Sequence, residues 1–155
     1  MRISLRLSIT VLSYFCVATL AGAAEKSISR SELPAAVKTT TDEQSKGATV
    51  RGYSTDRENG KLEYEVEMLV NGHTKDVTIA PDGRLLEIEE EVSLNSLSTQ
   101  VRSGLAAQAG KGKITKIESL TKNGKIVAYE AQVLLAGKHS EVQVGPDGGR
   151  LAHEE

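Results

Sequence analysis

The stretch "KLEYEVEMLVNGHTKDVTIAPDG", from Lys61 to Gly83, begins with a run in which apolar and charged residues alternate. Such alternation predicts a β-strand buried on one face, because successive side chains point to opposite sides of a strand. Gly72 then turns the chain, and the alternation around Val77 and Ile79 predicts the return strand of a hairpin. Gly83 closes a second turn, where its position favours a positive φ.

The second part of this stretch, "NGHTKDVTIAPDG" from Asn71 to Gly83, has a near-copy, "AGKHSEVQVGPDG", from Ala136 to Gly148, 65 positions further along the chain. The motif "NGK" also occurs twice, at Asn59 and Asn123. These ordered matches predict an α+β fold of two tandem repeats, residues 31–91 and 93–155. Each repeat is expected to be a helix followed by an antiparallel β-meander, with the helices packed on one face of the sheet. A unit of about 60 residues buries only about 60% of its unfolded surface, so we expect the two repeats to pack as one body.

Each repeat opens with an apolar stripe at helical spacing. The stripes comprise Leu33, Ala36, Val37 and Thr40 in the first repeat and Leu94, Leu97, Val101 and Leu105 in the second. Ser31 and Ser93 are the expected N-caps, and Gly110 is the expected end of the second helix. Short strands are expected near Thr49–Tyr53 and Ile114–Ser119.

Residues 1–23 have the pattern of a secretory signal peptide. Arg2 and Arg6 precede the apolar run "ITVLSYFCVATL", and "AGA" supplies small residues for cleavage. Cleavage is expected after Ala23 or Ala24, with no membrane anchor remaining. It also removes Cys16, the only cysteine, so no disulfide or thiol chemistry is expected. The pattern predicts a bacterial periplasmic or secreted protein.

The composition of the mature chain argues against several classes of partner. Loss of Arg2 and Arg6 leaves 17 basic against 21 acidic residues, a net charge of −4. A mildly acidic chain without a basic patch is a poor binder of nucleic-acid phosphates. The mature chain also has no Trp or Phe to stack on bases or sugars.

The sequence shows no arrangement of catalytic residues. It contains no G-x-S-x-G motif, and no histidine falls in an expected buried site. His73 and His139 each follow a glycine turn and could share a metal only if the two repeats faced each other. No carboxylate or cysteine lies at a metal-ligand spacing from either histidine. Asp82 and Asp147 lie in Pro-Asp-Gly turns, where aspartate is a common turn residue. We therefore predict a protein that is not an enzyme and has neither metal nor cofactor.

Acidic residues offer the main candidate binding surface. If the apolar residues of the alternating strands face the helices, a set of carboxylates shares the opposite face of the sheet. This set comprises Glu63, Glu65, Glu67, Asp76, Glu87, Glu89, Glu130 and Glu141. Neighbouring like charges on a sheet are unfavourable, so a cationic partner would relieve them. The alternative interpretation is a solvated face whose charge prevents edge-to-edge association.

The helix followed by "YEVE", a glycine turn and "KDVTIAPDGRLLEIE", with its second copy, resembles the PepSY and PepSY-like domains. These domains share the α/β layout of the β-lactamase inhibitor proteins. The resemblance implies an exported, non-catalytic module. Some relatives of this kind lie in propeptides of thermolysin-like metalloproteases, and others are short tandem proteins of bacterial envelopes.

The residues and the resemblance together predict a binding or regulatory module that engages an envelope or extracellular protein or a cationic ligand. The candidate partner-binding residues are Glu63, Glu65, Glu67, Asp76, Glu130 and Glu141. The alternative is a propeptide-like inhibitor of an extracytoplasmic protease. Its partner would then be the protease itself.

Overall fold

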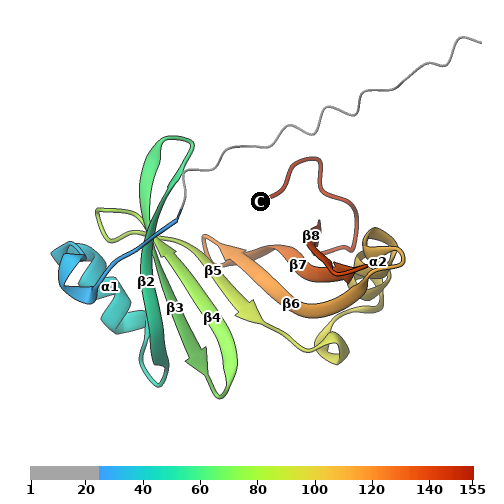
Figure 1. Cartoon of the computed structure of the whole chain (residues 1–155), viewed down its shortest axis with the longest axis horizontal. Helices are drawn as coiled ribbons and strands as arrows, with labels where there is room; N and C mark the ends of the chain where they lie inside the picture. The colour runs from blue at the N-terminus through green and yellow to red at the C-terminus, as the bar shows by residue number, and fades with distance from the viewer. Residues whose placement is uncertain (1–24) are drawn as a thin grey trace, which may run out of the picture.

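The computed structural model describes residues 25–155, and these residues form one continuous antiparallel sheet with two short helices. The strands follow one another in chain order across the sheet. They are β1 (Lys26–Ser27), β2 (Thr49–Glu58), β3 (Lys61–Val70), β4 (His73–Ile79), β5 (Leu85–Glu91), β6 (Lys113–Lys122), β7 (Lys125–Leu135) and β8 (Lys138–Val144). The helices are α1 (Ala35–Gln44) and α2 (Thr99–Ala109), and short 3-10 turns at Arg30–Glu32 and Leu94–Ser96 precede them. Strands β2 to β8 lie between the two helices in Figure 1.

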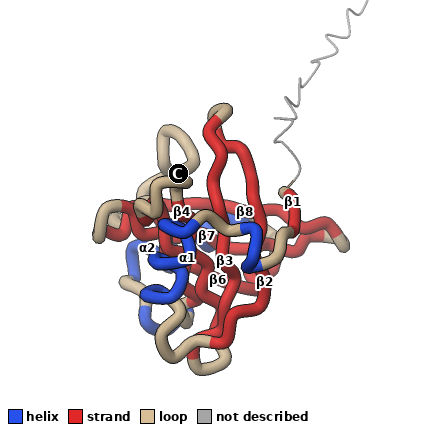
Figure 2. The backbone as a smooth tube through the Cα atoms, turned by 90° about the vertical axis from the view of Figure 1, so that its left-hand side faces the viewer, coloured by secondary structure: helices blue, strands red, loops and turns tan. Residues whose placement is uncertain are grey.

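The predicted fold of two helix-plus-meander repeats is wrong. The structure is dominated by a single eight-stranded sheet, and Figure 2 shows how little of its backbone is helical. Strand β5 pairs antiparallel with β6, from Glu87 opposite Lys122 to Glu91 opposite Glu118. This pairing joins the strands of the two predicted units in one sheet. In the described chain β8 is followed only by the isolated bridge between Val144 and Arg150, whereas β4 is followed by the full strand β5. The two halves are therefore unequal.

The helices and strands differ from the predicted ones at their ends. Helix α1 begins after Pro34, and Ser29 rather than Ser31 caps the 3-10 turn before it. Ser93 caps the other 3-10 turn, and Ser98 caps α2 through the backbone N–H of Val101. Gly110 ends α2 as expected. Strands β2 and β6 each span ten residues, twice the expected length of β2, because both pair along their full length in long hairpins.

Two apolar clusters lie on the helix side of the sheet. The cluster under α1 comprises Leu33, Val37, Tyr64, Val66, Met68, Val77 and Ile79. The cluster under α2 comprises Leu97, Val101, Leu105, Ile117, Ala131 and Val144. Leu94 was expected in the second stripe but remains 49% exposed, because the chain is in a 3-10 turn there and α2 starts only at Thr99. Burial of apolar area in these clusters supplies the main driving force for folding.

The glycines of the two Pro-Asp-Gly turns, Gly83 and Gly148, lie against the backbone of the helices. Gly83 has φ +87°, as the sequence predicted, and a Cβ there would lie 2.8 Å from the carbonyl oxygen of Ala36 in α1. Gly148 has φ +79°, and a Cβ there would come still closer to the backbone of Gln100 in α2. Only glycine combines a positive φ with such close approach at low cost. The two Pro-Asp-Gly turns therefore position the helices on the sheet.

Candidate binding site

The acidic side chains of β3 lie on the face of the sheet opposite the helices. Tyr64, Val66 and Met68 are buried in the cluster under α1, so alternation directs the intervening glutamates to the other face. Strand pairing then sets Glu67 directly opposite Asp76, and Asp76 directly opposite Glu89. Directly opposed residues of antiparallel strands have Cβ atoms about 4.5–5.5 Å apart, so these three carboxylates form a like-charged row across β3, β4 and β5.

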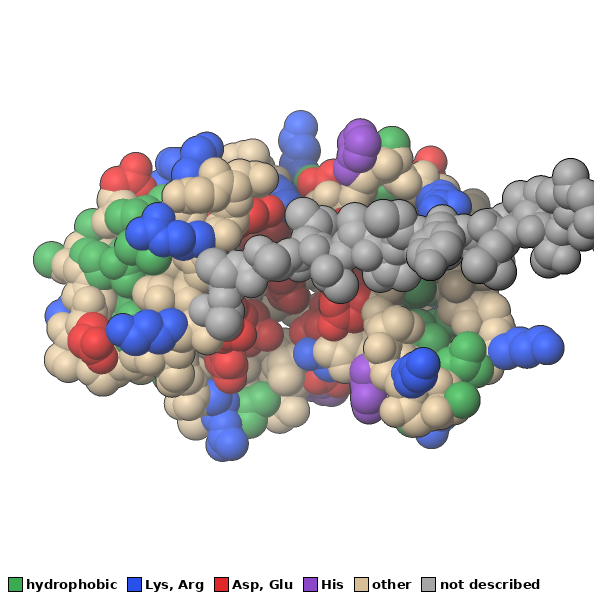
Figure 3. Space-filling view, turned by 45° about the horizontal axis from the view of Figure 1, so that its top comes forward, with side chains coloured by type: hydrophobic (Ala, Val, Ile, Leu, Met, Phe, Trp, Pro, Cys, Tyr) green, Lys and Arg blue, Asp and Glu red, His purple; other side chains and the backbone are tan. Residues whose placement is uncertain are grey.

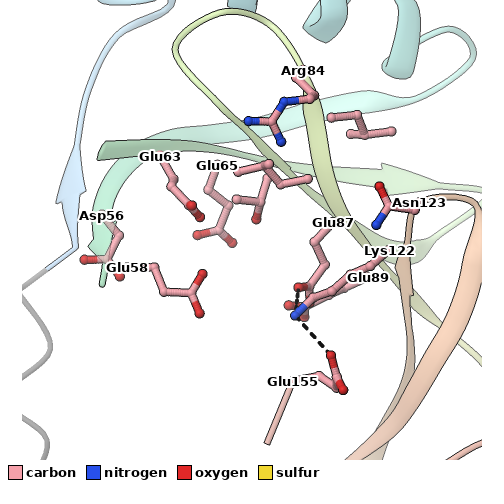
Figure 4. A pocket seen from close by; sticks show the side chains of 13 residues that line it. Asp56, Glu58, Glu63, Glu65, Arg84, Glu87, Glu89, Lys122, Asn123 and Glu155 are labelled. Carbon is pink, nitrogen blue, oxygen red and sulfur yellow. Dashed lines mark ion pairs between the residues drawn. The ribbon is translucent and has the colours of Figure 1, made fainter. Parts of the chain in front are cut away.

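Part of this face is hollowed into a groove of about 490 Å³, which we call the acidic groove. Its lining comprises Asp56, Glu58, Glu63, Glu65, Thr78, Arg84, Leu85, Leu86, Glu87, Glu89, Lys122, Asn123 and Glu155. Seven of these described residues carry carboxylates and two are basic. Figure 3 shows acidic side chains gathered along the hollow in the middle of the molecule, and Figure 4 shows several of them around the open centre of the groove.

The structure places the six binding residues predicted from the sequence at different positions, and only two of them line the acidic groove. Glu63 and Glu65 line the acidic groove. Glu67 and Asp76 belong to the adjoining row of carboxylates but do not line the groove. Glu130 lies on β7 opposite Glu118 and Gln143. Glu141 is exposed on the edge strand β8, beside a separate hollow that His139 also lines.

Burial raises the pKa of several carboxyl groups on this face. Desolvation, followed by the charges of Glu25, Asp76 and Glu67, raises the pKa of Glu65 to about 7. Desolvation and the charge of Glu118 likewise raise the pKa of Asp76 to about 6. A partly buried carboxylate loses hydration and is repelled by its neighbours, so both effects favour the neutral acid.

Glu89 has the most perturbed carboxyl group of the row. Desolvation is the main cause, and the charges of Glu87, Glu118 and Glu130 add to it, raising the pKa of Glu89 to about 8. The pKa of Glu63 is also raised, first by desolvation and then by the charge of Glu58. The groove therefore contains carboxylates whose negative charge is unfavourable in the free protein, and a bound cation would stabilise that charge.

Glu118 is the most buried acid of this face and was missed by sequence analysis. Its side chain is 4% exposed, and its Oε1 lies 2.7 Å from Nζ of Lys116 and accepts a hydrogen bond of 3.2 Å from Oγ1 of Thr74. A bulge between Ile114 and Lys116 shifts the alternation along β6. The signal that could have located Glu118 is its cross-strand position opposite Glu130, but the pairing register was not predicted.

Asp76, Glu89 and Glu118 bring carboxylate oxygens within 4.8 Å of one another. Oxygen donors of this kind suit a hard cation such as Ca²⁺ or Mg²⁺. The ammonium group of Lys116 already neutralises Glu118 from within the chain. Sequence analysis predicted no metal ligands. These three residues are the ones that the structure brings to ligand spacing in the described chain.

The turn residues considered as ligands take structural roles. His73 Nδ1 lies 3.3 Å from Oε1 of Glu91. Asp82 Oδ1 accepts a hydrogen bond of 3.0 Å from the backbone N–H of Arg84, and Asp147 Oδ1 accepts one of 2.8 Å from that of Gly149. In both Pro-Asp-Gly turns the aspartate side chain thus accepts a hydrogen bond from the backbone two residues further on, which confirms the interpretation of these aspartates as turn residues.

Lys122 is a basic residue at the edge of the groove that sequence analysis also missed. Its Nζ lies 3.0 Å from Oε2 of Glu87 and 3.6 Å from Oε2 of Glu155. Burial opposes its charge, but the hydrogen bond with Glu87 and the nearby carboxylates outweigh burial and raise its pKa. Lys122 therefore stays charged. Its ammonium group lies between the carboxylates of Glu87 and Glu155, so this part of the groove accommodates a positive charge.

The predicted signal peptide, with Cys16 and the cleavage site at Ala23 and Ala24, lies outside the described residues. Among residues 25–155, neither helix has the length and apolar character needed to cross a bilayer.

Neither a family model nor a curated protein sequence matches the chain. Solved structures of similar fold do exist. A DUF2874 family protein from Bacteroides ovatus is 18% identical with a TM-score of 0.59, and the match covers 76% of this chain and 84% of that one. A BLIP-like protein from Bacteroides fragilis is 19% identical with a TM-score of 0.56, covering 79% and 85%. A third, from Bacteroides eggerthii and provisionally described as periplasmic, is 16% identical with a TM-score of 0.59, covering 75% and 84%. The chain therefore has a BLIP-like fold.

Proposed function

We propose that the protein is an exported, non-catalytic binding module of PepSY-like type whose acidic groove engages a cationic segment of an envelope or extracellular protein. The observation that carries this proposal is the composition of the groove. Seven carboxylates and two basic side chains of the described chain line a space of about 490 Å³. Such an imbalance favours ligands that bring positive charge.

The location of the carboxylates strengthens this proposal over simple solvation of a sheet face. Glu65 and Glu89 are only partly exposed, and desolvation is the first cause of their raised pKa values. Charges kept solely for solubility are better placed where water solvates them fully. A lysine or arginine from a partner would replace the lost hydration and reduce the repulsion within the groove.

Export and PepSY-like character are supported by separate observations. The N-terminal residues have the pattern of a secretory signal, with Arg2 and Arg6 before an apolar run. The PepSY resemblance implies the inhibitor-protein layout, and the solved structures of similar fold include a BLIP-like protein. Neighbours of these kinds favour a binding module over an enzyme.

The second candidate is a propeptide-like inhibitor of an extracytoplasmic protease. The observation that favours it is the similarity in fold to a BLIP-like protein. The two functions differ in what the groove contacts, since an inhibitor must block a protease active site. Added mature protein should slow envelope metalloprotease activity under this alternative. It should leave that activity unchanged if the groove only captures a cationic segment.

The direct test measures binding of a fluorescent decalysine peptide to residues 25–155. Glu63 and Glu65 would be changed together to Gln, which removes two groove charges while retaining side-chain size. We expect affinity to fall about tenfold, and its dependence on salt to weaken, because each of the two changed residues contributes on the order of 0.7 kcal/mol in a partly desolvated site.

The matched control changes Glu43 and Glu90 to Gln. Both are exposed and lie outside the groove, and the net charge changes by the same amount. Affinity of this control should stay within about twofold of the parent, as expected for exposed charges. Equal losses in both variants would show that only net charge matters. The same pair of proteins, used as bait in an envelope extract, would separate groove partners from nonspecific ones.

A further inference from the structure

Beyond β8 the chain turns back toward the acidic groove, and we call residues 150–155 the C-terminal strap. The turn is closed by a 2.8 Å hydrogen bond from the N–H of Gly145 to the carbonyl of Gly149. Arg150 then bridges to Val144. At the far end of the strap, the N–H of Glu155 donates a hydrogen bond of 2.9 Å to Oε1 of Gln143. The strap is visible in Figure 1 as the segment that ends at the mark C.

The strap contributes one wall of the acidic groove. Glu155 lines the groove together with Asp56 and Glu58, which come from the end of β2. Figure 4 shows Glu155 on one side of the open centre and Glu58 on another, with Lys122 between Glu155 and the sheet. A ligand in the groove would therefore contact carboxylates from the sheet and from the strap at once.

The contacts that hold the strap in place are few and polar. Residues 152–155 are exposed, and Leu151 is only half-buried. Glu155 is tied to the sheet by the backbone hydrogen bond to Gln143 and by the 3.6 Å ion pair with Lys122. Segments with little buried apolar surface open locally at low free-energy cost. The strap is thus the part of the groove wall most able to move.

The charge of the strap makes its position depend on cations. The ion pair with Lys122 holds Glu155 near the sheet. A second cation in the groove would attract the strap further.

We propose that the C-terminal strap is a movable clamp that closes over a cationic segment in the acidic groove and slows its release. The proposal rests on the proposed function, since it takes the same cationic ligand in the same groove. In the free protein Lys122 sets the position of Glu155. In the complex the carboxylate of Glu155 contacts the ligand from the side opposite the sheet. The clamp therefore acts mainly on the dissociation rate.

The test measures association and dissociation rates of fluorescent decalysine by stopped flow, with residues 25–155 as the parent. Glu155→Gln should raise the dissociation rate about two- to fivefold, the effect of losing one partly exposed ion pair. Deletion of residues 153–155 should raise it at least as much. Glu154→Gln is the matched control, because Glu154 is adjacent and of equal charge but does not line the groove. Its dissociation rate should stay within about twofold of the parent.

A second measurement follows the strap without any ligand. Lys122→Gln removes the cation that holds Glu155, so hydrogen exchange of the Glu155 amide should become faster while exchange in β6 and β7 stays unchanged. Unchanged exchange at Glu155 would overturn the role of Lys122.

The outcomes separate the two proposals. If the parent binds no decalysine, the proposed function and the clamp both fail. If the parent binds decalysine but the strap variants dissociate at the parental rate, the clamp alone fails. Slower dissociation or tighter binding in the deletion variant would show that the strap excludes ligands, which also overturns the clamp.

Discussion

The acidic face of the sheet differs between its two halves. In β3 to β5, Glu67, Asp76 and Glu89 lie directly opposite one another without an interleaved basic residue. In β6 to β8, Glu118 pairs with Lys116, and Glu130 accepts a hydrogen bond of 2.8 Å from Gln143. These two acids of the second half are therefore neutralised or hydrogen-bonded within the chain.

This difference separates structural charge from charge available to a ligand. Acids that are matched by neighbours stabilise the sheet or at least cost little. Glu65, Asp76 and Glu89 are repelled by neighbouring carboxylates and partly desolvated, so their charge opposes folding. A cationic partner gains most from carboxylates of this kind, because its charge relieves the repulsion that they experience from neighbouring carboxylates. The contrast thus points to β3–β5 and the adjoining groove as the binding region.

The largest expected effect tests whether the two halves form one cooperative structure. Val66 and Val133 are buried, at 0% and 3% exposure, on the helix side of β3 and β7. Changing either to Asp should cost more than about 4 kcal/mol of stability, because an unpaired charge enters an apolar cluster.

Hydrogen exchange followed by mass spectrometry would report on each half separately. We expect Val66→Asp to abolish protection in β6–β8 as well as in β2–β5, because β5 pairs directly with β6. Retained protection of β6–β8 would mean that the halves fold independently.

The second effect concerns the two turns that hold the helices. Gly83→Ala and Gly148→Ala should each reduce the free energy of unfolding by about 2–3 kcal/mol, through strain at positive φ and a clash with helix backbone. Urea denaturation provides the measurement. Gly60→Ala is the control, because Gly60 has φ +79° but open space around it, so only about 1 kcal/mol of strain is expected.

The third effect is a pH dependence that arises in β3–β5. Glu65, Asp76 and Glu89 have pKa values raised to about 7, 6 and 8 in the folded state. The folded state therefore binds more protons than the unfolded state from about pH 4 to pH 8, and stability falls as pH rises through this range. After allowance for solvent screening we expect a loss of about 2 kcal/mol between pH 5 and pH 8.5.

Thermal melts at both pH values would measure this loss. Glu89→Gln should remove much of the pH dependence and raise the melting temperature at pH 8.5. Glu130→Gln should change the pH dependence less, because Gln143 already donates a hydrogen bond to that carboxylate. A stability that rises between pH 5 and pH 8.5 would contradict the assignment.

The smallest effect compares two hairpins at corresponding places in the halves. Asn71 and Ala136 both have positive φ, at 53° and 50°, before a glycine. Asparagine tolerates this conformation better than alanine does, so Ala136→Asn should stabilise the protein by about 0.5–1 kcal/mol. Asn71→Ala should destabilise it by a similar amount, as measured by urea denaturation. Destabilisation by Ala136→Asn or stabilisation by Asn71→Ala would show that these turns are not equivalent.

Much of the local structure could be predicted from the sequence. Alternation in Lys61–Val70 correctly separates the buried Tyr64 and Val66 from the glutamates between them. Gly83 has the predicted positive φ. In contrast, the apolar Leu135 is 50% exposed near the end of β7, although alternation places it on the same side as the buried Val133. Alternation does not tell where along a strand the covering helix ends.

The candidate site was only partly predictable for a related reason. Glu63 and Glu65 were identified from alternation and do line the acidic groove. Glu118, Lys122 and Glu155 were not, because their positions depend on a bulge in β6, on the pairing of β5 with β6 and on the path of the strap. These are contacts between residues far apart in the chain, and no local period encodes them.

The sequence by itself determined the features that depend on neighbouring residues. It determined the alternation along β3, the turn at Gly83 and the side of β3 that carries the acids, because side-chain direction and turn geometry follow from local backbone preferences. Only the tertiary structure decided that the strands join in one sheet and that a groove forms on its acidic face. It also decided which carboxylates have raised pKa values, because desolvation and repulsion are sums over residues brought together by folding.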